Sequence, residues 1–69
     1  MIFNLNGAEF IELIKLLKLL HIAESGGHAK IMVEEGEVKL NGEVEYRKRA
    51  KLRPGDKVET SGREISIDS

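Results

Sequence analysis

The chain has 69 residues, 33% of them charged, no cysteine and a formal net charge of −1. A chain of this length forms one domain, residues 1–69, without room for a cleft between domains or for several βαβ units. The lack of cysteine excludes disulfide bonds, thiolate zinc sites and a cysteine nucleophile. No stretch approaches the ~20 apolar residues of a membrane span, and the N-terminus lacks the basic start of a secretory signal. We therefore expect a cytoplasmic protein without a membrane partner.

The first six residues predict a short strand or an extended entry into the fold. Asn6 then resembles a helix N-cap, and Glu9 is placed to reach back to it. Apolar residues follow at helical spacing and predict a helix from about Gly7 to Lys18 or Leu20. The apolar stripe of this helix consists of Phe10, Leu13, Ile14, Leu17 and Leu20.

A second helix is predicted to start after Ser25, which is a good N-cap residue. Ala29, Met32 and Val33 recur at helical spacing behind it, and we expect them to pack in the core. Gly36 is well placed to end the helix in a left-handed conformation. Because the link between the two helices is short, they should form a compact hairpin.

The turn signal Asn41-Gly42 predicts a β-hairpin. A two-residue loop would place Leu40 opposite Glu43 and mix apolar and charged side chains on one face. A three-residue loop, residues 41–43, keeps the apolar side chains together, so we predict that register. It pairs Leu40 with Val44, Val38 with Tyr46 and Lys39 with Glu45.

Two further signals complete the fold. Residues 53–56, Arg-Pro-Gly-Asp, predict a turn. Residues 57–60 and 64–67 flank Ser61-Gly62 and predict a terminal hairpin. The predicted element order is β-α-α-β-β-β-β, and the predicted fold class is α+β, with a two-helix hairpin packed on a small antiparallel sheet.

The residues do not indicate catalysis. With only His21 and His28 and no cysteine, carboxylates would have to complete any zinc site. His28 and Ser25 lack the strained turn and orienting acid of a nucleophile site, and no glycine-rich phosphate-binding fingerprint occurs. We therefore expect no catalytic residue, no cofactor, no metal and no small-molecule substrate.

Residues 47–53, Arg-Lys-Arg-Ala-Lys-Leu-Arg, form a segment that we call the basic run. It holds five of the eleven basic residues and no acidic one, which leaves a charge of −6 on the rest of the chain. Screening at physiological salt acts over about 8 Å, so the basic run can attract phosphate in spite of the net charge. Alternatively, its cations pair with Glu43, Glu45 and Glu59 on an ordinary solvated surface.

A second candidate site is the predicted helix start at residues 25–30, Ser-Gly-Gly-His-Ala-Lys. A helix start exposes unpaired N–H groups and carries partial positive charge. The two glycines would let a phosphate approach closely, and His28 and Lys30 would add donors. Alternatively, the glycines are turn residues and His28 is simply exposed.

Four short motifs occur in a fixed order between Phe10 and Val58. They are Ser25-x-x-x-Ala29-Lys30, Gly36-x-Val38-x-Leu40-Asn41-Gly42, Arg47-x-Arg49-x-Lys51 and Pro54-Gly55-Asp56-x-Val58. Together they resemble the ribosomal protein S-four-type RNA-binding domain, which is also called the alpha-L RNA-binding motif. The pattern is similar to that of the small stand-alone bacterial members of this family.

The resemblance implies a non-catalytic protein that binds structured RNA, either ribosomal or transfer RNA, through a helix start and a following basic strand or loop. The expected partner is the ribosome or its precursors, and we expect a monomer. Many members carry arginine where Gly26 stands, so backbone N–H groups or His28 would replace that contact. The candidate RNA-binding residues are Lys18, Ser25, Gly26, Gly27, His28, Lys30, Arg47, Lys48, Arg49 and Lys51.

Two other interpretations stay open. A small protein-interaction module of β-grasp type has similar strands and turns, although its sulfur-carrier form needs a Gly-Gly carboxy-terminus and this chain ends Asp68-Ser69. A DNA-binding adaptor is the other alternative, because DNA also offers phosphates. With Phe10 and Tyr46 assigned to the core, we expect recognition of backbone and shape rather than of base sequence.

Overall fold

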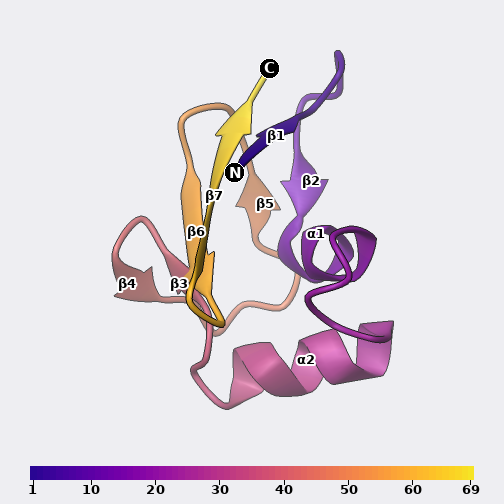
Figure 1. The fold of residues 1–69 in the computed structure, drawn as a ribbon, viewed down its shortest axis with the longest axis vertical. Coiled ribbons are helices and arrows are strands. Elements are labelled where there is room, and N and C mark those ends of the chain that lie inside the picture. Colours follow the sequence, from indigo (N-terminus) through magenta and orange to yellow (C-terminus); the bar gives the residue numbers. More distant parts are fainter.

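The computed structural model describes residues 1–69 and contains two helices beside a five-stranded sheet (Figure 1). The helices are α1 (Leu13–Leu19) and α2 (Gly26–Glu34), and neither is long and apolar enough to cross a membrane. A separate ribbon pairs β2 (Ile11–Glu12) with β5 (Lys51–Leu52). The main sheet has the order β1-β7-β6-β3-β4, with β1 (Ile2–Asn4), β7 (Arg63–Asp68), β6 (Lys57–Thr60), β3 (Lys39–Leu40) and β4 (Glu43–Val44).

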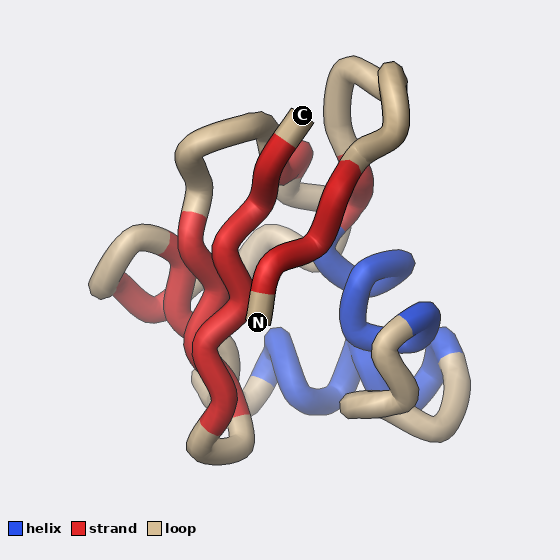
Figure 2. The backbone as a smooth tube through the Cα atoms, turned by 45° about the horizontal axis from the view of Figure 1, so that its top comes forward, coloured by secondary structure: helices blue, strands red, loops and turns tan.

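The α+β class is confirmed, but the main sheet is mixed rather than antiparallel. Strand β1 runs parallel to β7, with Ile2 opposite Ser66 and Phe3 opposite Ile67, whereas the other strand pairs are antiparallel. The parallel pair arises because the first strand joins the sheet beside the last one, at the edge opposite β4. Figure 2 shows the helices gathered together on one side of the strands.

The terminal hairpin is confirmed with its two-residue turn at Ser61-Gly62. Val58 lies opposite Ile65 in the β6–β7 pair, and both side chains are fully buried. Thr60, at the end of β6, donates a hydrogen bond from its hydroxyl to the Glu37 carbonyl at 2.9 Å. Val58 and Ile65 of this hairpin therefore belong to the hydrophobic cluster that also contains the buried residues of both helices.

The predicted register of the β3–β4 hairpin is wrong. The observed loop has two residues, Asn41 and Gly42, and places Leu40 opposite Glu43. Both loop residues have positive φ, 53° and 88°, which is the backbone of a type I′ turn that matches the twist of its strands. Because β4 is an edge strand with both residues exposed, no buried face penalises the mixed pairing.

The first helix starts later than predicted, at Leu13 instead of Gly7. Asn6 adopts positive φ in a turn and does not cap a helix, and the observed N-cap residue, Glu12, makes no side-chain capping bond. The residues before it instead form strand β2, which pairs with the basic run. Phe10 therefore lies outside the helix and is only half-buried.

The second helix is confirmed, with Ser25 as N-cap and Gly36 at positive φ beyond its end. Ala29, Met32 and Val33 are buried between this helix and its neighbours. They belong to one hydrophobic cluster of 15 buried residues that joins both helices, the sheet and the basic run. The helix hairpin is therefore held by the same core that fixes the strands.

Candidate nucleic-acid interface

The basic run connects β4 to β5 and crosses from the main sheet toward α1 (Figure 1). Its backbone caps the first helix: the Leu13 N–H donates to the Ala50 carbonyl at 2.9 Å, and the Ile14 N–H donates to the Lys48 carbonyl at 3.2 Å. These bonds satisfy two of the N–H groups that a helix start leaves free. The path of the run is thus fixed by main-chain contacts, which leaves its charged side chains free for other contacts.

The side chains of the basic run separate by direction. Ala50 and Leu52 point into the core, with exposed fractions of 4% and 0%. Arg49, Lys51 and Arg53, their neighbours in the sequence, are exposed. They lie where a turn, closed by the Ala50 N–H donating to the Arg47 carbonyl at 3.2 Å, leads into β5. Four cationic residues line one shallow hollow of about 470 Å³: Arg47, Arg49, Lys51 and Arg53.

Glu45 holds Arg47 at one end of this hollow. The Arg47 Nε and Nη2 donate to the two carboxylate oxygens of Glu45, both at 3.1 Å, and the Arg47 backbone N–H donates at 2.9 Å. The side-chain hydrogen bonds from Arg47 are the main reason why the pKa of Glu45 lies below its ordinary value. The Glu45 side chain is only 14% exposed and that of Arg47 is 77% exposed, so the remaining guanidinium N–H groups face solvent.

Lys48 points away from the hollow and binds α2. Its Nζ lies 3.1 Å from the Glu34 carboxylate, and both side chains are substantially exposed. Exposed pairs of this kind contribute about 0–1 kcal/mol and weaken with salt. A phosphate could therefore replace this carboxylate at little cost.

Phe10 supports the other end of the hollow. Its ring centroid lies 4.9 Å from the Lys51 Nζ and 5.6 Å from the Arg53 Cζ, within the range of cation–π contacts. The prediction that the core accounts for Phe10 is therefore wrong. The alternative in which nearby carboxylates neutralise the run holds only for Arg47, which pairs with Glu45. Lys48 pairs with Glu34 instead, and the three later cations, Arg49, Lys51 and Arg53, form no ion pair.

The start of α2 uses its polar side chains within the fold. The Ser25 hydroxyl accepts the His28 N–H at 3.1 Å, and the His28 Nδ1 accepts the Glu24 N–H at 3.0 Å. The neutral imidazole therefore carries its hydrogen on Nε2, which is the atom left to donate outward. A Cβ on Gly26 would meet nothing within 4 Å, and one on Gly27 would meet only the Ser25 hydroxyl at 3.8 Å. Packing within the chain does not require either glycine.

The two candidate segments lie at opposite ends of α2. Lys48 contacts Glu34, the last residue of the helix, whereas Gly26 is the first. At ~1.5 Å per residue, about 12 Å of helix separate them. Lys30 is exposed on this helix, and Lys18 is exposed in the last turn of α1. The basic run and the start of α2 are thus two separate groups instead of one patch.

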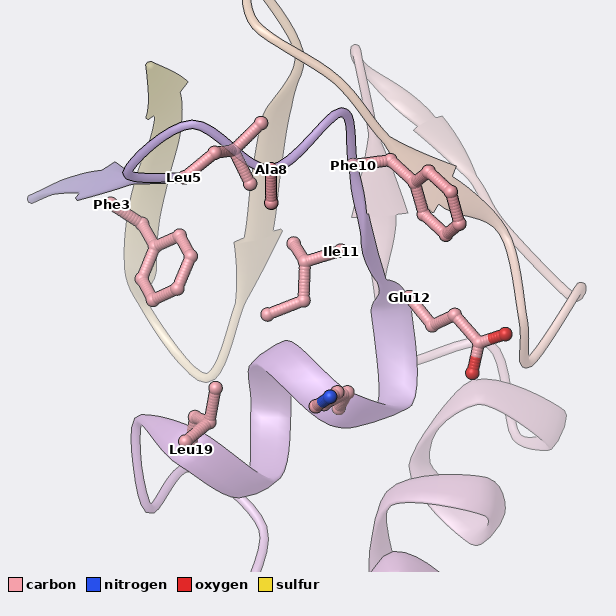
Figure 3. Close-up of a pocket in the computed structure, with 8 residues that line it drawn as sticks. Phe3, Leu5, Ala8, Phe10, Ile11, Glu12 and Leu19 are labelled. Atoms are coloured by element: carbon pink, nitrogen blue, oxygen red, sulfur yellow. The ribbon is translucent and has the colours of Figure 1, made fainter. Parts of the chain in front are cut away.

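An apolar groove lies on the other side of the N-terminal segment (Figure 3). It has a volume of about 420 Å³ and is lined by residues that include Phe3, Leu5 and Leu19. Phe10, Ile11 and Glu12, which precede α1, also line this groove (Figure 3). No group of three or more His, Asp or Glu side chains is arranged to hold a metal ion.

The predicted pairing of the basic run with Glu45 is confirmed for Arg47, whereas Glu43 and Glu59 form no ion pair with the run. Sequence reasoning missed the other two residues that contact its cations. Glu34 and Phe10 meet the run from distant parts of the sequence and carry no local signal. Tyr46, predicted to face Val38 in the core, is instead 63% exposed.

Known proteins share this sequence and fold. The family model described as "S4 domain" matches residues 3–68. The chain is 43% identical over 65 residues to the Escherichia coli protein named "Putative RNA-binding protein YbcJ", which covers 94% of this chain and 93% of the relative. It is 44% identical over 54 residues to the Bacillus subtilis protein named "Probable ribosome maturation protein RlbA", covering 78% of this chain and 76% of that protein.

A solved structure shares the whole architecture. The solution structure of YbcJ from Escherichia coli superimposes with a TM-score of 0.74 at 41% identity and covers 99% of this chain and 86% of that one. It is described as revealing an alfaL motif involved in RNA-binding. The two-helix hairpin beside a small sheet is thus an arrangement that this chain shares with a solved relative.

Proposed function

The chain belongs to the S4 domain family, and on this basis we propose that it is a non-catalytic protein that binds structured RNA. The names of the relatives support RNA as the ligand, and that of the Bacillus subtilis relative supports ribosomal RNA or a ribosome precursor ahead of transfer RNA. The same relative supports action in the cytoplasm, where ribosomes mature. We propose that the chain acts there as a single RNA-binding domain and as a monomer.

One observation carries this proposal: the outward row of cations along the basic run. The four cations line one shallow hollow formed by the turn at residues 47–50 and by β5, so one phosphodiester backbone that passes through it can contact several of them. Arg49, Lys51 and Arg53 have no carboxylate partner to displace, and Arg47 is already oriented by Glu45. The row can therefore bind phosphates with little rearrangement.

The start of α2 would hold a second phosphate about one helix length away. The backbone N–H groups of Gly26 and Gly27 have no acceptor in the chain and lie at the positive end of the helix. Ser25 would position this helix start, His28 Nε2 and Lys30 would add donors to it, and Lys18 would add a cation from the last turn of α1. Two phosphate sites at a fixed separation suit a folded RNA with a defined backbone geometry.

The test is a charge-removing triple variant, Arg47→Gln with Lys48→Gln and Arg49→Gln. We expect it to fold normally by circular dichroism and to bind a ribosomal RNA hairpin more weakly at every sequence tested. The slope of log affinity against log salt should fall by roughly 0.7–0.9 for each lost phosphate contact. If the variant binds as tightly as the parent, the assignment of the basic run is wrong.

The matched control removes three cations elsewhere, by Lys39→Gln, Lys57→Gln and Arg63→Gln. Lys39 and Arg63 line a hollow that also holds Glu37, Glu59 and Glu64, and Lys57 lies 3.6 Å from Glu64. Because these cations lie among carboxylates rather than in a basic hollow, their removal should leave the salt slope unchanged. Competition between duplex RNA and duplex DNA tests the DNA-binding alternative, and equal affinity would contradict the RNA assignment.

A further inference from the structure

Tyr46 is the only aromatic residue that the fold leaves open to solvent. It is 63% exposed, whereas Phe3 and Phe10 are half-buried. Its hydroxyl makes no hydrogen bond within the chain, so no polar contact explains its position. Tyrosine and other aromatic residues that lie open beside polar groups are typical of contact surfaces.

The ring is supported from one side by Gly36. A Cβ built on Gly36 would lie 3.2 Å from the Tyr46 Oη and 3.5 Å from its Cε1, so a larger residue would push the ring away. Val44 Cγ1 lies 3.6 Å from the same point. Gly36 also has φ +75°, a conformation that favours glycine. The ring thus lies close to the chain just after α2, at Gly36, and beside strand β4.

The residues that flank Tyr46 are held in place. Glu45, before it, accepts three hydrogen bonds from Arg47, after it. Lys48 is bound to Glu34, two residues before Gly36. The exposed ring therefore stands at the start of the basic run with its backbone fixed on both sides, next to the first cation of the phosphate-binding row.

We propose that Tyr46 is a stacking platform for an unpaired nucleobase whose flanking phosphates contact Arg47 and Arg49. Unpaired bases of RNA stack on aromatic side chains, whereas the faces of paired bases inside a duplex are covered by their neighbours. The preferred ligand is therefore a paired RNA stem that carries an unpaired nucleotide, such as a bulge. This inference rests on the proposed RNA binding and adds the class of RNA that the surface selects.

The experiment compares two RNA hairpins with the same stem, one fully paired and one with a single bulged 2-aminopurine. The parent protein should prefer the bulged RNA by at least about fivefold, because stacking on one aromatic ring has this effect or a larger one. The 2-aminopurine emission should be quenched on binding. The chain has one tyrosine and no tryptophan, so the intrinsic emission of the protein reports on Tyr46 itself.

Two variants distinguish the role of the aromatic ring from that of the hydroxyl, since one removes only the hydroxyl and the other removes the ring. Tyr46→Phe should keep the preference for the bulged RNA and the quenching, whereas Tyr46→Leu should lose both and still bind the paired RNA like the parent. An abasic nucleotide at the bulge should abolish the preference in the parent protein, which tests the idea without altering the fold. Ile2→Ala is the matched control, since Ile2 is an exposed apolar residue at the opposite edge of the sheet.

The outcomes distinguish the two proposals. If the parent binds both hairpins equally and 2-aminopurine emission is unchanged, stacking on Tyr46 is overturned while RNA binding stands. If the parent binds neither hairpin, RNA binding fails and stacking fails with it. If Tyr46→Leu lowers affinity for both RNAs by the same factor, Tyr46 acts on the fold or on the run instead of on an unpaired base, and stacking is again overturned.

Discussion

The basic run and the start of α2 leave different groups available to bind phosphate, side chains in the first and main-chain N–H groups in the second. In the run, main-chain carbonyls are used by the fold, because those of Lys48 and Ala50 cap α1, while three cationic side chains remain without a carboxylate partner. At the helix start, the side chains of Ser25 and His28 are used by the fold, while main-chain N–H groups remain free. Each segment thus keeps one kind of phosphate-binding group available.

This difference predicts different responses to substitution and salt. Affinity from the basic run should depend on side-chain charge and fall steeply with salt, because each cation–phosphate contact releases counterions. Affinity from the helix start should depend more on backbone geometry, so replacing Ser25, whose hydroxyl caps the helix, should act through folding. Three substitutions test this contrast, beginning with the one that has the largest expected effect.

Leu52→Ala should destabilise the fold by removing the core packing of the basic run. Leu52 is fully buried within the hydrophobic cluster, so its truncation should lower the free energy of unfolding by about 2–5 kcal/mol. Arg49→Ala, three residues earlier, should change it by less than about 0.5 kcal/mol because Arg49 is exposed and unpaired. Urea unfolding followed by circular dichroism measures both, and equal effects would show that the inward and outward residues are not separated as described.

The parts of the fold that the sequence predicts well are those with strong local signals. Ser25 as N-cap and the apolar spacing behind it define α2, and the Ser61-Gly62 turn defines the terminal hairpin. In each case residues close in the chain supply the contacts that fix the element. The motif pattern likewise identifies the family because it lies within these elements and the turns between them.

The misplaced elements depend on distant contacts. The helix start at Leu13 is decided by carbonyls of the basic run, more than 30 residues later in the chain. The register of β3–β4 depends on the position of β4 at an edge, where the twist preference of the turn outweighs the alternation of side chains. That single-residue shift also moves Tyr46 out of its predicted place opposite Val38, and no local pattern indicates the resulting exposed ring.

Ser25→Ala should have the next largest effect, and it should act on stability alone. Removing an N-cap hydroxyl costs about 0.5–2 kcal/mol, and the His28 N–H would lose its acceptor. Ser25→Asn should restore most of this loss because asparagine caps helices equally well. Thermal unfolding measures the loss, and RNA affinity corrected for the folded fraction should stay within about twofold of the parent. A larger drop in affinity would show that the hydroxyl itself contacts RNA.

Glu45→Gln should have the smallest effect, and its signature is a change in pH dependence. The pKa of Glu45 in the folded protein lies below its ordinary value of 4.5, mainly because the Arg47 side chain donates hydrogen bonds to the carboxylate. A lowered folded pKa means that ionised Glu45 favours the folded state above pH 4.5 and that this contribution disappears as the pH falls through the folded pKa.

The parent should therefore be slightly more stable than Glu45→Gln at neutral pH, by less than the effect of Ser25→Ala, and the two unfolding curves should converge in acid. Glu43→Gln is the control, because Glu43 is exposed and forms no ion pair, so its stability should follow that of the parent at every pH. If Glu45→Gln also followed the parent at every pH, Arg47 would be as free as Arg49. No cation that lines the hollow would then be held by a carboxylate of the chain. The basic run would keep all of these side chains for binding, in full contrast to the start of α2, where the side chains of Ser25 and His28 are used within the fold.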